Sequence, residues 1–518
     1  MKDRPNFLIF VVDQMRADWL GCTGHKVVKT PNIDAIAAKG TIFSDFHVAL
    51  PVCMPNRASM MTGRMPSLHG VRYNGLPLSR RANTFVDVLA KAGYDTAMIG
   101  KSHFQPFTDQ APLQAPDHTE RLIAEAWEPD GQSYTQEEPE TYAGETETPF
   151  EGSYYGFKHV QMVTGHGHRC GGHYAQWFRR KHPDWKELHD PANERPHSYT
   201  CPQAFRTPVP ESSYPTAWIA DKAVDYLRER DETPFCAMVS FPDPHHPFNP
   251  PGRYWDMYDP EDFDISLPFE GHQNPPPPLV HARYEWEQGK TPPIPQIGFF
   301  AGDREIKEAM ALTAGMVTMI DDQVDRVVEA LKASGKSDNT VIIFTSDHGD
   351  YLGAFNLLLK GPLQHHSITR VPFIWSDCEG AQTANTDALA STIDLSASVL
   401  DRAGLEPYWG MQGKSLLNAI QDGTGPRDAL LIEHNDGGPR MGLKQPARVR
   451  TLRTAKWRLS LYANENWGEL YDLSADPNET KNLWEDTSAS GVKSDLALQL
   501  AEELAKQMDE SPRSNRLA

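Results

Sequence analysis

Apolar runs alternate with amphipathic stretches along most of the chain. Asn6 to Val12 and Asn339 to Thr345 are continuous apolar runs, the pattern of strands covered on both faces of a parallel sheet. Shorter runs predict further strands at Thr96 to Ile99, Phe235 to Phe241 and Val371 to Trp375. Helical spacing predicts helices at Thr84 to Ala92, Ile219 to Arg230 and Leu312 to Leu331, the last ended by Gly335. This alternation predicts an α/β fold with a doubly wound, mostly parallel central sheet flanked by helices.

Three regions depart from this alternation. Two insertions, at about 105–210 and 249–300, are rich in proline, glycine and aromatic residues, and we expect them to wall a substrate pocket. After about residue 425 the runs become short and alternating, and a helical pattern at about Asp495 to Met508 closes the chain. We therefore predict a large α/β domain at 1–425 and a small C-terminal antiparallel α+β subdomain at 426–518.

Charge and cysteine spacing exclude several classes of protein. A formal net charge of −20 over 518 residues argues against nucleic acid and membrane partners. The six cysteines show no C-x-x-C pair and no zinc spacing, so they indicate neither a disulfide framework nor a structural zinc site. The longest apolar run near the start, Phe7 to Val12, is too short for a signal peptide or a membrane span, and we expect a cytoplasmic protein.

Two acids follow the two strongest strand candidates. Asp13 and Asp347 would both lie at the carboxyl ends of central strands, where open α/β sheets bind their ligands. Between them in sequence, Cys53 opens a predicted helix, whose N-terminus suits an anion and lowers a thiol pKa. Taken alone, each acid would more often be a cap at the end of a strand, and the cysteine would more often be a small buried residue. Their combination favours a catalytic centre.

The segment Cys53-Met54-Pro55-Asn56-Arg57, followed by Thr62-Gly63, resembles the Cys-x-Pro-x-Arg signature of the sulfatase family. The resemblance implies the alkaline phosphatase and sulfatase type of α/β fold. It also implies that a formylglycine-generating maturation enzyme oxidises Cys53 to formylglycine. In that family the hydrated aldehyde is bound to a divalent metal and attacks the ester, so a covalent intermediate forms on this residue.

The same resemblance implies the ligands of one divalent metal ion. These are Asp13, Gln14, Cys53, Asp347 and His348. Oxygen ligands suit Ca²⁺ and an imidazole favours Mn²⁺, with Mg²⁺ and Zn²⁺ as alternatives. Typical sulfatases have a second acid where this chain has Gln14 and an amide where it has His348, and in this respect the chain resembles the phosphonate monoester hydrolase branch.

Further site residues follow from similar motifs. The catalytic set comprises the Cys53 nucleophile with Arg57, Lys101, His103, His245 and Lys360, and the substrate-binding set comprises Asn74, Lys101, His245 and Lys360. His245 is the expected general acid, with His246 as the neighbour that could replace it. His166, His168 and His173 are expected to line the pocket rather than to bind metal.

The sequence thus predicts hydrolysis of small anionic sulfate monoesters, in the manner of an arylsulfatase, through formylglycine made from Cys53. The alternative is a phosphonate monoester or phosphodiester hydrolase with the same nucleophile; Gln14 and His348 favour it, while Lys101 and His103 favour the sulfatase. An inactive binding protein on the same scaffold, with Cys53 unmodified, is the alternative of another class. We expect a homo-oligomer because the family commonly forms one.

Overall fold

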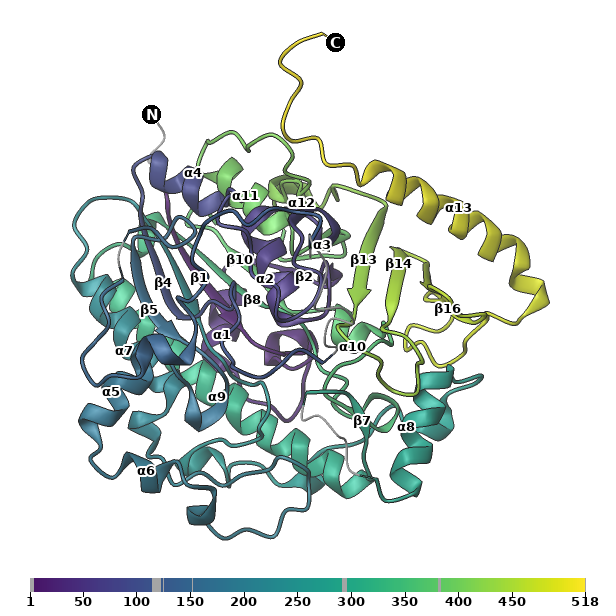
Figure 1. The fold of residues 1–518 in the computed structure, drawn as a ribbon, viewed down its shortest axis with the longest axis horizontal. Helices are drawn as coiled ribbons and strands as arrows, with labels where there is room; N and C mark the ends of the chain where they lie inside the picture. The colour runs from purple at the N-terminus through teal and green to yellow at the C-terminus, as the bar shows by residue number, and fades with distance from the viewer. Residues whose placement is uncertain are drawn as a thin grey trace.

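A large, mostly parallel sheet forms the centre of the protein (Figure 1). The computed structural model describes residues 4–113, 123, 125–150, 152–290, 296–380 and 383–517. The eight-stranded sheet has the order β11-β2-β10-β8-β1-β6-β4-β5. Its strands are β1 (Asn6–Val12), β2 (Thr41–Phe43), β4 (Asp95–Lys101), β5 (His159–Val163), β6 (Phe235–Ser240), β8 (Thr340–Ser346), β10 (Phe373–Ser376) and β11 (Asn385–Thr386). The five strands from β8 to β5 run parallel, and β10 is antiparallel to both of its neighbours.

Strand β1 shows why the sheet is covered on both faces. All seven of its residues are buried. Phe7, Ile9 and Val11 join one hydrophobic core, whereas Leu8, Phe10 and Val12 join the other, as expected when successive side chains point to opposite faces. A continuous apolar run is therefore the pattern that this position requires, and the predicted doubly wound fold is confirmed.

Helices on each face complete these two cores. One core receives residues from α1 (Pro31–Ala37), α5 (His173–Lys181), α7 (Pro215–Arg228) and α9 (Asp303–Ala333), and the other from α2 (Cys53–Thr62), α4 (Phe85–Lys91), α11 (Asp394–Arg402) and α12 (Leu417–Asp422). The other helices and strands that precede the C-terminal sheet are α3 (Pro66–His69), α6 (Trp185–Leu188), α8 (Pro277–Glu287), α10 (His366–Thr369), and the strands of two small sheets, β3 (Phe46–His47) with β12 (Ala390–Ser391) and β7 (Phe299–Phe300) with β9 (Leu357–Leu358).

The first predicted insertion contains part of the central sheet. Strand β5 pairs in parallel with β4, from Ala97 opposite His159 to Lys101 opposite Val163. Its sequence, HVQMV, has a partly polar pattern because β5 is the edge of the sheet, and so it lacks the continuous apolar run of the central strands. Parts of both insertions lie outside the described residues.

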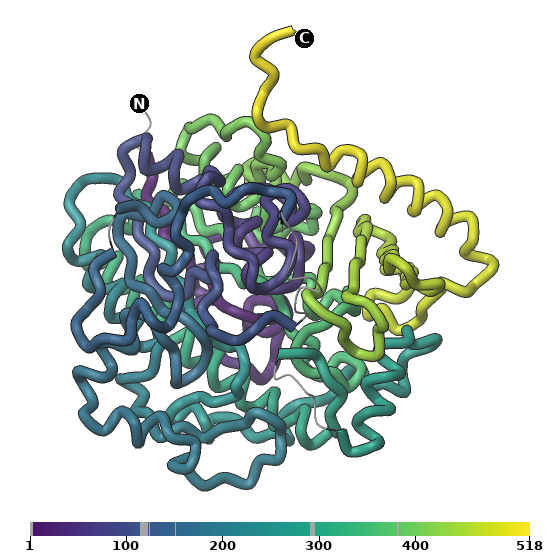
Figure 2. Tube along the Cα trace, viewed as in Figure 1, coloured from purple at the N-terminus to yellow at the C-terminus, as the bar shows by residue number. Residues whose placement is uncertain are grey.

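The C-terminal region forms a separate antiparallel sheet, as predicted. It contains β13 (Ala429–Asn435), β14 (Arg448–Thr454), β15 (Trp457–Tyr462) and β16 (Gly468–Asp472), with α13 (Ser490–Lys506) packed on its outer side (Figure 1). The last helix begins five residues before the predicted start. Beyond α13 the chain returns to the large domain, where the Trp409 indole donates to the Glu510 carbonyl (Figure 2). The domain boundary at 425 stays a prediction.

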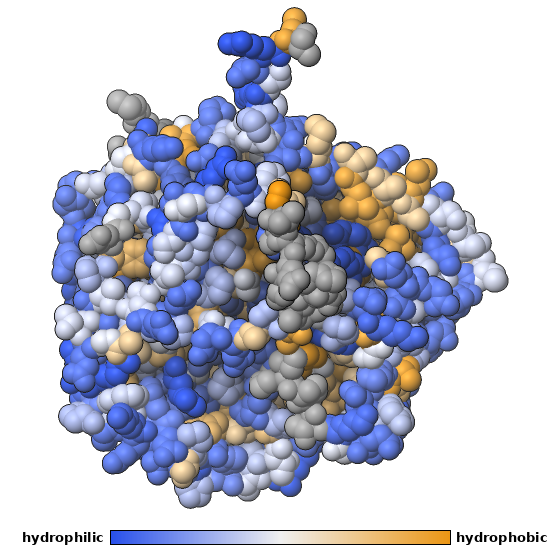
Figure 3. Space-filling view, viewed as in Figure 1, coloured by the Kyte–Doolittle hydropathy of each residue, from blue (hydrophilic) through white to orange (hydrophobic). Residues whose placement is uncertain are grey.

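The surface is mostly hydrophilic in the view of Figure 3, with apolar atoms gathered beside α13. Exposed Leu498 and Leu504 belong to that helix. Within the described ranges, no helix is both long and apolar enough to span a bilayer.

Candidate active site

The ends of β1 and β8 bring two buried carboxylates together. Val12 lies opposite Ser346 in the parallel pairing, so Asp13 and Asp347 leave the sheet side by side. The Gln14 backbone N–H donates to Asp347 Oδ1 at 3.1 Å, which ties the two strand ends to each other. Both aspartates are completely buried. The predicted placement of two acids at one edge of the sheet is therefore seen in the structure.

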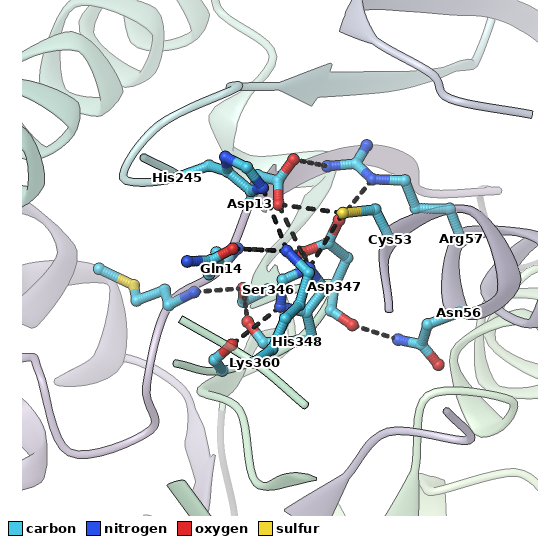
Figure 4. A network of polar contacts seen from close by, with 12 residues as sticks. Asp13, Gln14, Cys53, Asn56, Arg57, His245, Ser346, Asp347, His348 and Lys360 are labelled. Carbon is cyan, nitrogen blue, oxygen red and sulfur yellow. Dashed lines mark hydrogen bonds and ion pairs between the residues drawn. The ribbon is translucent and has the colours of Figure 1, made fainter. Parts of the chain in front are cut away.

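Cys53 begins α2 and faces these acids (Figure 4). Its Sγ lies 3.0 Å from His348 Nε2 and 3.7 Å from Asp13 Oδ1. The other ring nitrogen of His348, Nδ1, is 2.8 Å from the Gly349 carbonyl, to which it can only donate. That bond leaves an unprotonated Nε2 facing the cluster, the tautomer of a metal-binding histidine.

The donor set fits a divalent cation. Ligand atoms of Asp13, Cys53, Asp347 and His348 all lie within 4.8 Å of one another, and all four residues are buried. Burial opposes ionisation of Asp13, but the charges of Lys101 and other cationic neighbours outweigh it and hold its pKa well below the ordinary range. Two oxygen donors and an imidazole match the preferences of Mn²⁺ and related ions.

The side chain of Gln14 bonds to Lys360, Asp350 and His246. Its Oε1 accepts a hydrogen bond from Lys360 Nζ at 2.6 Å, and its Nε2 lies 2.5 Å from Asp350 Oδ2 and 3.2 Å from His246 Nδ1. A metal ligand role for Gln14 needs its amide oxygen, which Lys360 holds here. That role stays a prediction.

Arg57 and Lys101 place positive charge behind the carboxylates. Arg57 Nε donates to Asp347 Oδ2 at 2.6 Å, and its Nη1 donates to the Lys101 carbonyl at 2.6 Å and to Ser240 Oγ at 2.9 Å. Lys101, at the end of β4, donates from Nζ to Asp13 Oδ2. Both side chains are buried, so the planar guanidinium is held by fixed bonds rather than by solvent.

Residues from three distant segments, His166, His245 and Lys360, meet on one side of the site. His245 Nε2 lies 3.1 Å from Lys360 Nζ, and its Nδ1 donates to the His246 carbonyl at 2.6 Å. His166 stacks on His245 with ring centroids 3.6 Å apart, and its Nε2 is 2.5 Å from Lys101 Nζ. Burial, followed by the charges of His166 and His246, lowers the pKa of His245 well below its ordinary value.

His103 and Asn74 lie at the margin of the site. The His103 ring packs on Phe107 with centroids 4.1 Å apart, and its Nδ1 has no hydrogen-bond partner among the described residues. Asn74 is exposed, and its Oδ1 accepts the backbone N–H of Met54, next to Cys53. The contacts attach Asn74 to the helix that carries Cys53, and the substrate roles of both residues stay predictions.

The sequence did not define a catalytic role for His166. The sequence predicted only that His166 lines the pocket with His168 and His173, but in the structure it stacks on His245 and contacts Lys101. His168 instead stacks on Phe205, and His173 bonds to backbone groups of the insertion. No local pattern distinguishes the three histidines. His246 and Asp350, which hold Gln14, carried no signal for that role either.

Comparisons with known proteins match nearly the whole chain. The family model described as sulfatase matches residues 5–405, and that of the C-terminal part of N-sulphoglucosamine sulphohydrolase matches residues 360–507. An arylsulfatase of Clostridium perfringens is 29% identical over 93% of this chain and 90% of its own. A multifunctional alkaline phosphatase superfamily protein, PehA of Trinickia caryophylli, is 27% identical over 95% and 94%. The crystal structure of a phosphonate monoester hydrolase of Agrobacterium radiobacter shares the fold, with a TM-score of 0.78 at 24% identity over 99% and 98% of the two chains.

Proposed function

Because the chain belongs to the sulfatase family, we propose that it hydrolyses sulfate monoesters in the manner of an arylsulfatase, with a nucleophile made from Cys53. The observation that carries the proposal is the convergence of Cys53 with Asp13, Asp347 and His348 on one buried point. Sulfatase relatives support hydrolysis of sulfate esters as the general activity. The substrate preference and the modified nucleophile are the specific parts of the proposal.

The encoded thiol is a poor nucleophile in this setting. Burial, with the charge of Asp13, raises the pKa of Cys53 to about 12, so the side chain is a neutral thiol at pH 7. A thiolate is the reactive form of cysteine, and this environment suppresses it. Conversion to formylglycine by a maturation enzyme would replace the thiol by an oxygen nucleophile at the same position.

Asp13, Asp347 and His348 would hold the divalent metal beside this nucleophile, with Ca²⁺ or Mn²⁺ as the expected ion. When bound, the metal would supply Lewis-acid activation of an oxygen at neutral pH. Arg57 would orient the nucleophile through its position one turn along α2 and fix Asp347 through its 2.6 Å bond.

Three cations would receive the anionic ester. Arg57, Lys101 and Lys360 carry about three positive charges against about three negative charges on Asp13, Asp347 and Asp350, and a divalent ion would raise the local net charge to about +2. This field opposes the charge of the whole chain and attracts a singly charged sulfate ester. Donors placed in advance also stabilise charge that develops on the ester oxygens in the transition state.

His245 would donate a proton to the leaving oxygen of the ester. In the free site its Nε2 accepts from Lys360 Nζ at 3.1 Å. An ester anion held between Lys101 and Lys360 would raise the pKa of His245, since an opposite charge favours the protonated ring. The proton on Nε2 could then pass to the departing alkoxide, and the Nδ1 bond to the His246 carbonyl would keep the ring in place.

A phosphonate monoester or phosphodiester hydrolase is the second candidate. Gln14 and His348 occupy the two ligand positions at which this chain departs from the usual sulfatase motif. Such substrates also carry a single negative charge, so the same three cations suit them. This candidate uses the same nucleophile and metal, and it differs only in the ester that is preferred.

Two measurements test these proposals. Intact-mass spectrometry on protein from a host competent in maturation should show a loss of about 18 Da at Cys53, and an unmodified, inactive protein would instead support a binding function. Comparing kcat/KM for an aryl sulfate and an aryl phosphonate monoester decides the class of ester. A phosphonate preference of ~100-fold, about 2.7 kcal/mol of transition-state binding, would reverse the choice.

A further inference from the structure

A completely buried carboxylate from the first insertion, Glu137, bonds to the backbone beside the catalytic set. Its Oε2 accepts the backbone N–H of His103 at 2.9 Å. Its Oε1 accepts the backbone N–H groups of Phe104 at 2.7 Å and of Gln105 at 2.9 Å. Backbone N–H groups can only donate, so the carboxylate is the common acceptor of three successive donors.

The conformation of His103 explains why these donors meet at one point. Its φ is 56°, in the left-handed region that residues other than glycine rarely adopt. A left-handed residue in a turn makes successive N–H groups converge, and such concave sites bind anions. Here the anion belongs to the same chain, since Glu137 lies 34 residues after His103. Without it, three buried donors would lack an acceptor, so Glu137 stabilises the left-handed turn.

A catalytic residue bonds to the same segment. Arg57 Nη1 donates to the Lys101 carbonyl at 2.6 Å, two residues before His103. The Tyr154 hydroxyl, from the first insertion, donates to Glu137 Oε1 and so fixes the carboxylate in turn. The end of β4, which carries two residues of the catalytic set, is therefore held both by Arg57 and by the insertion.

The His103 ring depends on this turn for its position. Its Nδ1 is buried and has no hydrogen-bond partner among the described residues, and the ring packs on Phe107 with centroids 4.1 Å apart. A functional side chain keeps its geometry only when surrounding groups fix it. Because polar contacts do not hold Nδ1, a change in the backbone dihedrals of His103 would move the imidazole relative to the rest of the site.

From these contacts we propose that Glu137 is a positioning residue for the hydrolytic reaction: its carboxylate fixes the left-handed turn and thereby sets the direction of the His103 ring. The inference rests on the proposed function and deepens it, because it connects the first insertion to a catalytic residue. Within the described part of the chain, none of the hydrogen bonds of this carboxylate reaches a metal ligand. Its effect on turnover must therefore pass through the turn.

The test is a double-mutant cycle on the full chain with its metal. Values of kcat and KM are measured for the wild type, Glu137→Gln, His103→Ala and the double variant. The substrate is whichever of 4-nitrophenyl sulfate and an aryl phosphonate monoester the wild type cleaves faster. Glutamine keeps the shape of glutamate but turns an NH₂ donor toward backbone donors.

We expect Glu137→Gln to lower kcat by ~10- to 100-fold, the effect of a catalytic group displaced by about 1 Å, with KM changed by less than ~2-fold. In the His103→Ala background the same substitution should lower kcat by no more than ~2-fold, because residues that act through one another are not additive.

Glu308→Gln is the matched control. Glu308 is also buried, and its Oε2 accepts the backbone N–H groups of Thr200 at 2.7 Å and of Cys201 at 2.8 Å, outside the catalytic set. This substitution disturbs a similar arrangement of a carboxylate and successive backbone donors. It should lower the thermal midpoint about as much as Glu137→Gln does, but it should leave kcat unchanged.

A milder variant tests the same contact if Glu137→Gln does not fold. Tyr154→Phe removes one donor to the carboxylate and leaves the three backbone bonds in place. It should lower kcat by ~3-fold, the effect of one hydrogen bond, and this fall should also disappear in the His103→Ala background.

The outcomes separate positioning from stability and from the underlying activity. Equal falls of kcat in the two backgrounds would show that Glu137 supports the fold rather than His103, and would overturn the proposal. An unchanged kcat in Glu137→Gln, or an effect on KM alone, would overturn it as well, while leaving the proposed function standing. A wild type that cleaves neither ester, with Cys53 modified and metal bound, would refute the hydrolase function itself and the positioning role with it.

Discussion

Replacement of Lys360 by methionine tests the charge distribution of the site most directly. Lys360 is 6% exposed, and its Nζ contacts Gln14 Oε1 at 2.6 Å and His245 Nε2 at 3.1 Å. A hydrogen bond to a charged group contributes about 1.5 to 3 kcal/mol, and two charges 4 Å apart interact by about 4 kcal/mol at an effective dielectric constant of 20. We therefore expect Lys360→Met to lower kcat/KM for an aryl sulfate by about 2 to 4 kcal/mol, or roughly 30- to 1000-fold.

A pH profile distinguishes this electrostatic effect from a loss of structure. Burial is the main cause that lowers the pKa of His245, and Lys360 adds to it, so removing the cation should raise this pKa. The limb of the kcat/KM profile that reports His245 should accordingly move to higher pH. Lys336→Met is the matched control, since Lys336 is 11% exposed and pairs with Glu232 at the amino end of the sheet. A fall below ~5-fold, in protein with full Cys53 modification, would refute the assigned role.

Three further results are expected. Cys53→Ala should abolish sulfate ester hydrolysis while the far-UV circular dichroism spectrum is retained; residual turnover above ~1% would exclude Cys53 as the source of the nucleophile. Removal of divalent metal by a chelator should abolish activity and lower the thermal midpoint, because the buried Asp13 and Asp347 then keep only Arg57 and Lys101 to neutralise them. Mn²⁺ or Ca²⁺ should restore both; activity that resists chelation at equilibrium would count against the ion. Arg458 pairs with Glu479 at 2.6 Å and, although burial opposes ionisation of Glu479, this charge holds its pKa well below the ordinary range. Its contribution to stability should be complete above the unfolded pKa of about 4.3 and be lost as pH falls through the lower folded pKa, so urea unfolding of Glu479→Gln should show a weaker pH dependence than the wild type in that acidic window.

The polar inner face of the C-terminal sheet links that last prediction to the active site. Arg458, Glu469 and Tyr462 form a buried network on this face, and Tyr462 bonds to Pro362 beside the segment of Lys360. Loss of the network should therefore disturb the docking of the C-terminal sheet as well as its own stability. Breaking a buried ion pair by removing one partner costs about 3 to 5 kcal/mol, because an uncompensated charge remains.

The sequence by itself determined the inner strands of the central sheet and the acids at their carboxyl ends. The seven apolar residues of β1 could be placed because a strand buried on both faces needs an unbroken apolar run, and Asp13 could be placed because such a run ends where it leaves the core. Cys53 and Arg57 stand in a local motif one helical turn apart. Each of these signals depends only on residues that are close in the chain, so each can be recognised without knowledge of the fold.

Only the tertiary structure decided which distant groups meet. The pairing of β5 with β4, the stacking of His166 on His245 and the bond from Lys360 to Gln14 all join segments that are far apart in the chain. Hydrophobic periodicity reports how deeply a residue is buried, but strand order and register decide what lies across from it. For that reason the residues expected to do the chemistry could be named from the sequence, whereas their partners required the folded chain.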